Sequence, residues 1–259
     1  MTPSAPLLPS DLNTHFVGRL RARDAKAWFE LWETFGPVLR AQLSRWGRGK
    51  VGIETVQDLS QETLAALANS IDTHDPTRGA RFSTWLLAIA KHTLYGEIDR
   101  RMAAKRGAGV RPDRLDDIGD GPKAADRPDD DYERSVFEAK VSAALRAVER
   151  EMGLMEFSVY RMRVLDGQSG KQVAAALGIS EPTVSRRLSA VRERLRERLG
   201  ETFARYSFTE EELFELGRNG LELNPTKTTD GGFDEALAEI VHRSHARRST
   251  LEGPPGATH

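Results

Sequence analysis

Apolar residues recur at three- and four-residue intervals through much of this 259-residue chain, a pattern that indicates amphipathic helices. Residues 13–106 are predicted to form one helical domain with three helices, near residues 28–46, 53–71 and 83–101. Within them, Gly36-Pro37 predicts a bend, and Asp75–Gly79 has the composition of a turn. Alternation typical of strands is scarce, so the domain is expected to be all-helical.

A second helical domain is predicted over residues 134–200, where apolar stripes resume near Ser135. Between the two domains, residues 107–133 lack periodicity and are rich in aspartate, glycine and proline, which predicts a flexible acidic linker. Residues 1–12 contain prolines and no periodic pattern, and are expected to be a disordered leader. The fold class is therefore all-α, with two helical domains joined by a linker.

The most informative segment, residues 171–188, predicts a helix-turn-helix. A short helix with an apolar face is followed by Gly178, which enters the left-handed region without steric cost. Ser180 is a good N-cap for the second helix, and Pro182 is tolerated in its first turn. Arginines near the start of the second helix suit insertion into the major groove. The alternative is a helical hairpin in an ordinary bundle.

Residues 201–259 form an extension that neither domain obviously requires. Thr209 and Glu212 predict a capping box, residues 217–232 a loop, and residues 233–241 an amphipathic helix. Because short isolated helices are marginal in water, these helices need a partner. We expect a regulatory tail that folds onto the protein's own domains, and the alternative is a mostly disordered appendage.

Charge is balanced overall, at a formal net of −1, but it is segregated along the chain. Basic residues gather near residues 100–111 and 186–198, and acidic residues in the linker, so local charge is the better guide to partners. The absence of cysteine excludes disulfides, thiolate zinc sites and a cysteine nucleophile. No apolar run approaches the roughly 20 residues of a membrane span, and the N-terminus is unlike a signal peptide. These features predict a cytoplasmic protein without membrane insertion.

Catalytic chemistry has no evident basis in the sequence. No carboxylate pair, Ser/His/Asp set or phosphate loop stands out, so the chain is not expected to be an enzyme or to need a cofactor. His242 and His245 are three residues apart, a spacing that can bind a metal, but a third ligand is not apparent and no metal is expected.

Two separate parts of the chain resemble one known family. Asp58–Leu64, Asp75–His92 and Glu97–Arg101 resemble region two of RNA polymerase sigma factors, and Met155–Leu199 resembles their region four. With only an acidic linker between them, the arrangement is similar to the extracytoplasmic-function (ECF) group of the sigma-70 family. The resemblance covers about residues 13–200. It implies a factor that binds core RNA polymerase and directs promoter-specific transcription initiation, reading the −10 element with region two and the −35 element with region four.

The resemblance also implies a face that docks on core RNA polymerase, made by Asp58, Gln61 and Glu62. The family is usually more acidic just before this face, where the present chain has Thr55 and Gln57. Phosphorylation by a Ser/Thr kinase could add the missing negative charge, and the hydroxyl candidates are Thr55, Ser60 and Thr63. An anti-sigma factor is a second regulatory partner that the resemblance suggests.

For DNA, the resemblance implies two sets of contacts. The −10 element would be melted and read by Arg78, Arg81, Lys91, His92, Thr93, Arg100 and Arg101. The −35 element would be read by Thr183, Ser185, Arg186, Arg187, Ser189 and Ala190. Within these sets, His92 stands where the family often has asparagine, and Thr183 and Arg187 are expected on phosphates. Trp85 is expected in the core, and Arg192–Arg198, interleaved with glutamates, is expected to be a solvated, salt-bridged helix.

The resemblance also implies that the linker threads a basic channel of the polymerase, where it would mimic nucleic acid through Asp113, Asp116, Asp117, Asp120 and Asp126.

Two other functional classes stay open at the level of sequence. One is a one-component regulator that binds an operator through the helix-turn-helix and a ligand through the N-terminal domain. The other is an enzyme with an accessory DNA-binding module. Co-purification with core polymerase discriminates among the three classes.

Overall fold

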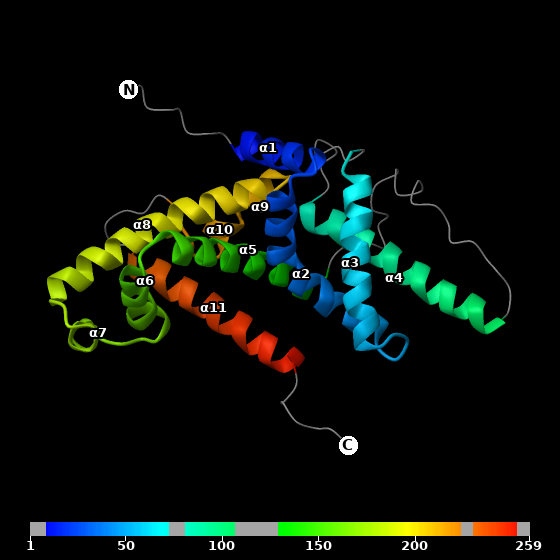
Figure 1. The fold of residues 1–259 in the computed structure, drawn as a ribbon. Coiled ribbons are helices and arrows are strands. Elements are labelled where there is room, and N and C mark those ends of the chain that lie inside the picture. Colours follow the sequence, from blue (N-terminus) through cyan, green and yellow to red (C-terminus); the bar gives the residue numbers. More distant parts are fainter. Residues whose placement is uncertain (1–8, 73–80, 107–128, 224–229, 253–259) are drawn as a thin grey trace, which may run out of the picture. The chain divides into compact units, whose positions relative to one another are not determined.

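The computed structural model describes residues 9–72, 81–106, 129–223 and 230–252, and regular structure within these ranges is helical (Figure 1). The chain divides into two compact units. The first comprises Met1–Val136 and Arg205–Glu212, and the second comprises Phe137–Ala204 and Leu213–His259. The predicted all-α class with two helical domains is confirmed.

The first unit is built on α1 (Pro9–Arg21), α2 (Ala25–Gly47), α3 (Ile53–Ser70) and α4 (Phe82–Arg106), with α2, α3 and α4 packed against one another. Asp24 starts α2, because its carboxylate accepts hydrogen bonds from the backbone N–H groups of Lys26 and Ala27. Buried apolar residues from all four helices form the core, among them Leu20, Leu39, Leu59 and Leu86.

Two details of the first unit differ from the sequence prediction. Helix α1 begins at Pro9, so the predicted disordered leader is wrong for residues 9–12, and residues 1–8 lie outside the described part. Helix α2 continues through Pro37, so the bend predicted there does not interrupt it. Gly36 lies against the Trp32 ring, where an added Cβ would come within 2.8 Å, so this glycine serves close packing.

Residues 205–212, here called the strap, are the unexpected part of the first unit. Tyr206 is 1% exposed, and its ring centroid lies 5.1 Å from that of Phe16 and 4.9 Å from that of Phe35. The Asn13 side chain donates hydrogen bonds to the carbonyl oxygens of Arg205 (3.2 Å) and Ser207 (3.0 Å). A segment that follows the helix-turn-helix in sequence thus completes the core of the N-terminal helices.

The predicted capping box lies in the strap and is confirmed. The Glu212 carboxylate accepts hydrogen bonds from the backbone N–H groups of Phe208 and Thr209, and the Thr209 hydroxyl accepts one from the Glu212 N–H. It starts the short helix α9 (Glu210–Leu213).

The second unit contains most of α5 (Asp130–Glu151), then α6 (Leu154–Tyr160), a π-helical turn η4 (Arg161–Leu165), α7 (Gly170–Leu177), α8 (Glu181–Arg205), α10 (Glu215–Arg218) and α11 (Asp230–Glu252). One core joins them, and it includes Val141, Tyr160, Leu195 and Leu237. Helix α8 runs past the predicted domain end at residue 200. The alternative of a disordered appendage is wrong for the described residues of the extension.

Two predicted loops are only partly covered. Residues 107–128 of the linker, with its five proposed aspartates, and residues 224–229 of the C-terminal loop lie outside the described part, as does the predicted turn at residues 75–79. Helix α5 begins at Asp130, within the predicted linker. Among the helices that the structure describes, none is both long and apolar enough to cross a membrane.

Candidate nucleic-acid interface

The predicted helix-turn-helix is formed by α7 and α8. Ser169 and Gln172 make a capping box at the start of α7. Gly178 ends that helix with a φ of 64°, in the left-handed region predicted for this glycine. Ser180 then caps α8, its hydroxyl oxygen accepting a hydrogen bond of 3.4 Å from the Thr183 N–H. The turn and both caps therefore depend on residues that are close together in the sequence.

The start of α8 presents a polar face to solvent. Ser185, Arg186, Ser189 and Ala190 are exposed, whereas the opposite face packs into the core through Val184, Leu188 and Val191. The Arg186 guanidinium makes two long contacts within its own helix, at 3.3 Å to the Thr183 hydroxyl and 3.4 Å to the Pro182 carbonyl. Such weak contacts leave the guanidinium able to turn toward a base edge.

Arg187 and Thr183 are half-buried, in contrast to the exposed face. Arg187 forms an ion pair of 3.7 Å with Glu156 on α6, which holds its side chain beside that helix. A phosphate contact from Arg187 would therefore compete with Glu156.

The arginines that follow on α8 divide into two groups. Arg194 and Arg198 both pair with Glu151 at the end of α5, at 2.7 Å each, and also with glutamates of their own helix. Desolvation acts to raise the pKa of the Glu151 carboxyl, but hydrogen bonds from Arg198 and Arg194 outweigh it and leave that pKa lowered.

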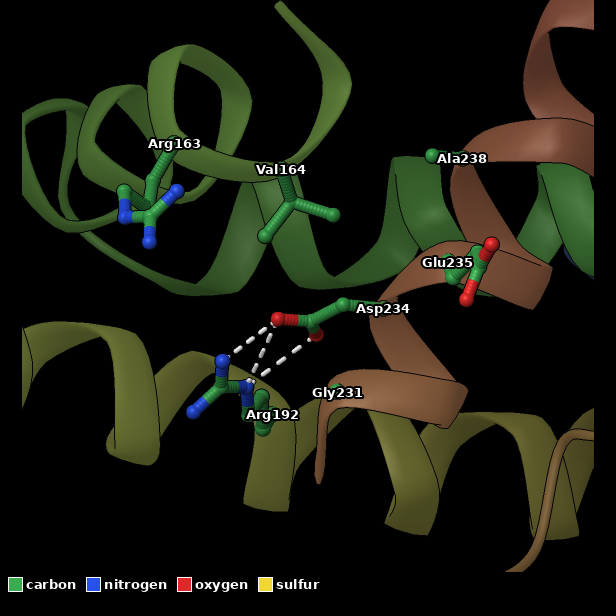
Figure 2. Close-up of a pocket in the computed structure, with 7 residues that line it drawn as sticks. All are labelled: Arg163, Val164, Arg192, Gly231, Asp234, Glu235 and Ala238. Carbon is green, nitrogen blue, oxygen red and sulfur yellow. Dashed lines mark hydrogen bonds and ion pairs between the residues drawn. The ribbon is translucent and has the colours of Figure 1, made fainter. Parts of the chain in front are cut away.

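Arg192 and Arg196 form the second group and pair with α11 instead, and Figure 2 shows the pair of Arg192 with Asp234. Arg192 contacts both carboxylate oxygens of Asp234, and Arg196 lies 2.6 Å from Asp230. Their side chains are only 15% and 12% exposed. The expectation of a solvated, salt-bridged helix is wrong for these two residues, because a helix far away in the sequence covers them.

On the first unit, the three residues expected to dock on polymerase share one exposed face of α3. Asp58, Gln61 and Glu62 point away from the core, into which Leu59 and Thr63 are buried from the same turns. Carboxylates and an amide at this spacing can pair with a basic partner surface.

The residues expected at the −10 element lie mainly on α4. Lys91 lies over the Trp46 ring, its Nζ 5.4 Å from the centroid, and His92 and Thr93 are half-exposed. Trp85 is 8% exposed and packs against Phe82, which confirms its expected place in the core.

The other arginines expected at the −10 element form ion pairs, wherever the structure describes them. Arg100 and Arg101 both pair with Glu97, and Arg81 lies 3.4 Å from Glu133. Arg78 lies outside the described residues. Contacts from these arginines to phosphates would replace existing pairs.

Comparison with family models decides the identity of the two units. Residues 31–103 match the model of sigma-70 region 2, and residues 156–195 match that of sigma-70 region 4. The chain is a sigma factor of the sigma-70 family, of the ECF type. A search of curated proteins found no match. The two matched regions establish a factor for promoter recognition in transcription initiation, with core RNA polymerase and promoter DNA as its partners.

The sigma-factor function takes the place of the alternative of a one-component, ligand-binding regulator. Sigma factors as a class are non-enzymatic initiation factors. Both family matches end before the extension. Region two and region four of this sigma factor are therefore each completed by residues that the family models do not include.

Two exposed residues beside the expected site residues were not predicted from the sequence. Glu54 is exposed one helical turn before Asp58 on α3, so it adds a carboxylate to the face that is expected to dock on polymerase. Tyr95 is 56% exposed on α4, four residues after Lys91. Helical spacing could have indicated both: Glu54 at i−4 from an acidic position, and an aromatic ring on a polar helix face.

The three hydroxyls considered for phosphorylation differ in access. Ser60 and Thr63 are buried, and each hydroxyl donates to a backbone carbonyl of its own helix, those of Gln57 and Leu59. Thr55 is half-buried, and its hydroxyl accepts a hydrogen bond of 2.6 Å from Arg101. Access therefore favours Thr55 over the other two.

Proposed function

We propose that this sigma factor reads the −35 element with the exposed start of α8. Ser185, Arg186, Ser189 and Ala190 would face the major groove, and Thr183 and Arg187 would contact flanking phosphates. The observation that carries the proposal is the capped helix-turn-helix, whose second helix buries one face and leaves a small-residue face with one arginine exposed.

The −10 element would be opened and read along α4. Lys91, His92 and Thr93 lie one after another on this helix, and Tyr95 follows with an exposed ring. Unpaired bases stack on aromatic rings and their phosphates pair with cations, which offsets the few kcal/mol that unstacking costs. Arg78, Arg81, Arg100 and Arg101 would supply further phosphate contacts.

Docking on core polymerase would use the α3 face of Asp58, Gln61 and Glu62, with Glu54 as a fourth member. Four exposed polar side chains at i, i+4, i+7 and i+8 form a continuous strip on one side of the helix. The acidic segment between α4 and α5 would add binding energy by threading a basic channel of the polymerase.

Regulation by a Ser/Thr kinase would act at Thr55. A phosphate there would add negative charge to the docking end of α3 and could pair with Arg101, which already contacts the Thr55 hydroxyl. An anti-sigma factor would have to cover the α3 strip or the start of α8, the two exposed faces proposed for polymerase and DNA. With polymerase and DNA as partners, we place the sigma factor in the cytoplasm.

Reconstitution with core RNA polymerase tests the proposal. The holoenzyme should initiate at a defined set of promoters, and sequencing the 5′ ends of its transcripts on genomic DNA should yield two sequence elements upstream of the starts. Replacing Arg186 should change the upstream element alone, whereas replacing His92 and Tyr95 should change the downstream one. Transcripts that start without a common upstream element would contradict −35 reading by α8.

A further inference from the structure

Helix α11 lies outside both family matches, yet it belongs to the core of the region-four domain. Phe233, Leu237 and Ile240 are at most 2% exposed, so this helix cannot leave without exposing a large apolar face. Helix α11 also makes polar contacts with α8 and with the π-helical turn η4.

The first place is the recognition helix α8. Arg192 Nε donates to both oxygens of Asp234 at 3.1 Å (Figure 2). Asp230 lies 3.4 Å from Arg192. The hydroxyl of Tyr160, the last residue of α6, lies 3.4 Å from the same Asp234 carboxylate. The side chains of Arg192 and Asp234 are 15% and 14% exposed, so solvent screens this pair weakly. Asp234 thus joins α6, α8 and α11.

The second place is the π-helical turn η4, which follows α6 and precedes α7. His242 Nε2 lies 2.9 Å from the Leu165 carbonyl oxygen at the end of this turn. The last carbonyls of a helical segment have no partner within it, so the imidazole N–H supplies a donor. Helix α11 is therefore anchored on both sides of α7.

The position of Arg192 along α8 connects these anchors to DNA reading. It comes seven residues after Ser185 and three after Ser189. Seven residues of α-helix bring the side chain back to within about 20° of its starting direction, so Arg192 continues the stripe of Ser185 toward the end of the helix. Holding Arg192 fixes the rotation of α8 about its axis, and base-reading side chains need orientation to within about 10–20°.

We propose that residues 230–242 brace the helix-turn-helix, and that Asp234 is a positioning residue for −35 recognition. The proposal rests on the proposed reading of the −35 element by α8. Asp234 acts through Arg192 and does not touch DNA itself. The brace makes promoter choice depend on a segment some forty residues beyond the region-four match.

A different role for the same carboxylates is to shield Arg192 and Arg196 from DNA phosphates. The structure favours positioning, because the Phe233 ring lies 4.5 Å beneath the Arg196 guanidinium and Tyr160 also bonds to Asp234. Screening the two arginines from phosphates would require only the carboxylates, without these two further contacts. The two roles predict opposite changes in DNA affinity.

The test uses full-length sigma factor in reconstituted holoenzyme and measures open-complex formation on a matched promoter and on the same promoter with an altered −35 element. The ratio of the two affinities is the −35 discrimination. Asp234→Asn should lower this ratio by at least about threefold, a part of what one base contact supplies. His242→Ala should lower it in the same direction, because it removes the other anchor. Glu239→Gln, at a 67% exposed carboxylate of the same helix, is the matched control and should leave the ratio unchanged.

Binding to core polymerase and thermal unfolding are measured for each variant, and the DNA assay is run where every variant is folded. The exchange Arg192→Asp with Asp234→Arg should restore part of the lost discrimination. A lower unfolding temperature with an unchanged ratio would show a structural role only and overturn the proposal. Tighter binding to both promoters, with a steeper salt dependence, would show shielding and also overturn it. If the wild-type ratio is itself close to one, −35 reading by α8 fails instead, separately from the brace.

Discussion

At the residue scale, exposure and pairing distinguish side chains that look alike in the sequence. The arginines of α8 are an example: Arg186 is exposed, Arg187 is held by Glu156, and Arg192 is nearly covered by Asp234. Their chemistry is the same, but only Arg186 can reach DNA without giving up an ion pair. The packing thus gives each arginine a different set of partners.

Arg186→Ala should therefore relax preference at one position of the −35 element and cost about 1–3 kcal/mol of binding there. A panel of promoters with single −35 substitutions, assayed with the reconstituted holoenzyme, measures this. Arg187→Ala is the comparison and should weaken all promoters of the panel alike. Uniform weakening by Arg186→Ala would mean that it contacts only phosphate.

A pH dependence also follows at this scale. The hydrogen bond from Arg196 lowers the pKa of Asp230, and bonds from Arg198 and Arg194, outweighing desolvation, lower that of Glu151. The unfolded chain, with ordinary pKa values of 3.8 and 4.5, takes up these protons first as pH falls. Stability of the region-four domain should thus be complete above the ordinary values and be lost as pH falls through the lowered ones.

Urea unfolding followed between about pH 6 and pH 2.5 measures this loss. Asp230→Asn removes one of the two groups and should make the curve flatter. An equally steep curve for this variant would show that Asp230 contributes nothing to the acid sensitivity.

At the element scale, α3 has a buried face and an opposite, exposed face that is proposed to dock on polymerase. Val56, Leu59 and Thr63 are buried against the other helices, and Asp58 is exposed on the opposite side. A charge change on the exposed side should therefore leave the fold intact, which makes the docking proposal directly testable.

Asp58→Arg should reduce binding to core polymerase, because a basic side chain would meet a basic partner surface. A pull-down with purified core enzyme and a circular dichroism melt check binding and fold together. Glu239→Arg, an equal charge reversal on α11, controls for the change in net charge. Normal assembly of the Asp58→Arg holoenzyme would remove α3 from the docking interface.

The strap, also at the element scale, is expected to stabilise the region-two domain. Tyr206→Ala removes a ring that is 1% exposed and packed against Phe16, Phe35 and Phe82, so it should destabilise the region-two domain by about 3–5 kcal/mol. Phe214→Ala, at a ring that is 66% exposed, is the control and should be nearly neutral. Urea unfolding of the full chain measures both. Equal midpoints for the two variants would contradict a structural role of Tyr206.

At the scale of the whole molecule, the extension is divided between the two units. Residues 205–212 belong to the first and residues 213–259 to the second. A regulatory tail, as expected from the sequence, would therefore act from within the folded domains rather than from outside them.

Two truncations separate these contributions. Ending the chain after Glu212 removes α11 and should increase hydrogen exchange in α5, α6 and α8 alone. Ending it after Ala204 also removes the strap and should increase exchange in α2 and α4 as well. Exchange in α2 and α4 that is the same in both truncated proteins would contradict the assignment of the strap to the first unit. Transcription assays of the two proteins test the regulatory role in the same samples.

The sequence by itself determined the features that depend on neighbours within a few residues. Helical periodicity predicted the all-α class, Gly178 and Ser180 predicted the turn, and Thr209 with Glu212 predicted the capping box. Two motifs in order also led to the family, which the region models confirmed. These signals are local, because caps, turns and periodicity involve residues at most a turn or two apart.

Only the tertiary structure decided which polar residues form long-range pairs and where the extension packs. Asn13 bonds to the Ser207 carbonyl across 194 residues, and Arg192 pairs with Asp234 across 42. No local pattern encodes such a pair. An arginine with a glutamate nearby in its own helix is predicted to be solvated, and this prediction is the same whether or not another helix covers it. Burial of a polar side chain depends on which distant segment packs over it. In this protein the apolar faces of α11 and of the strap determine where those two segments pack.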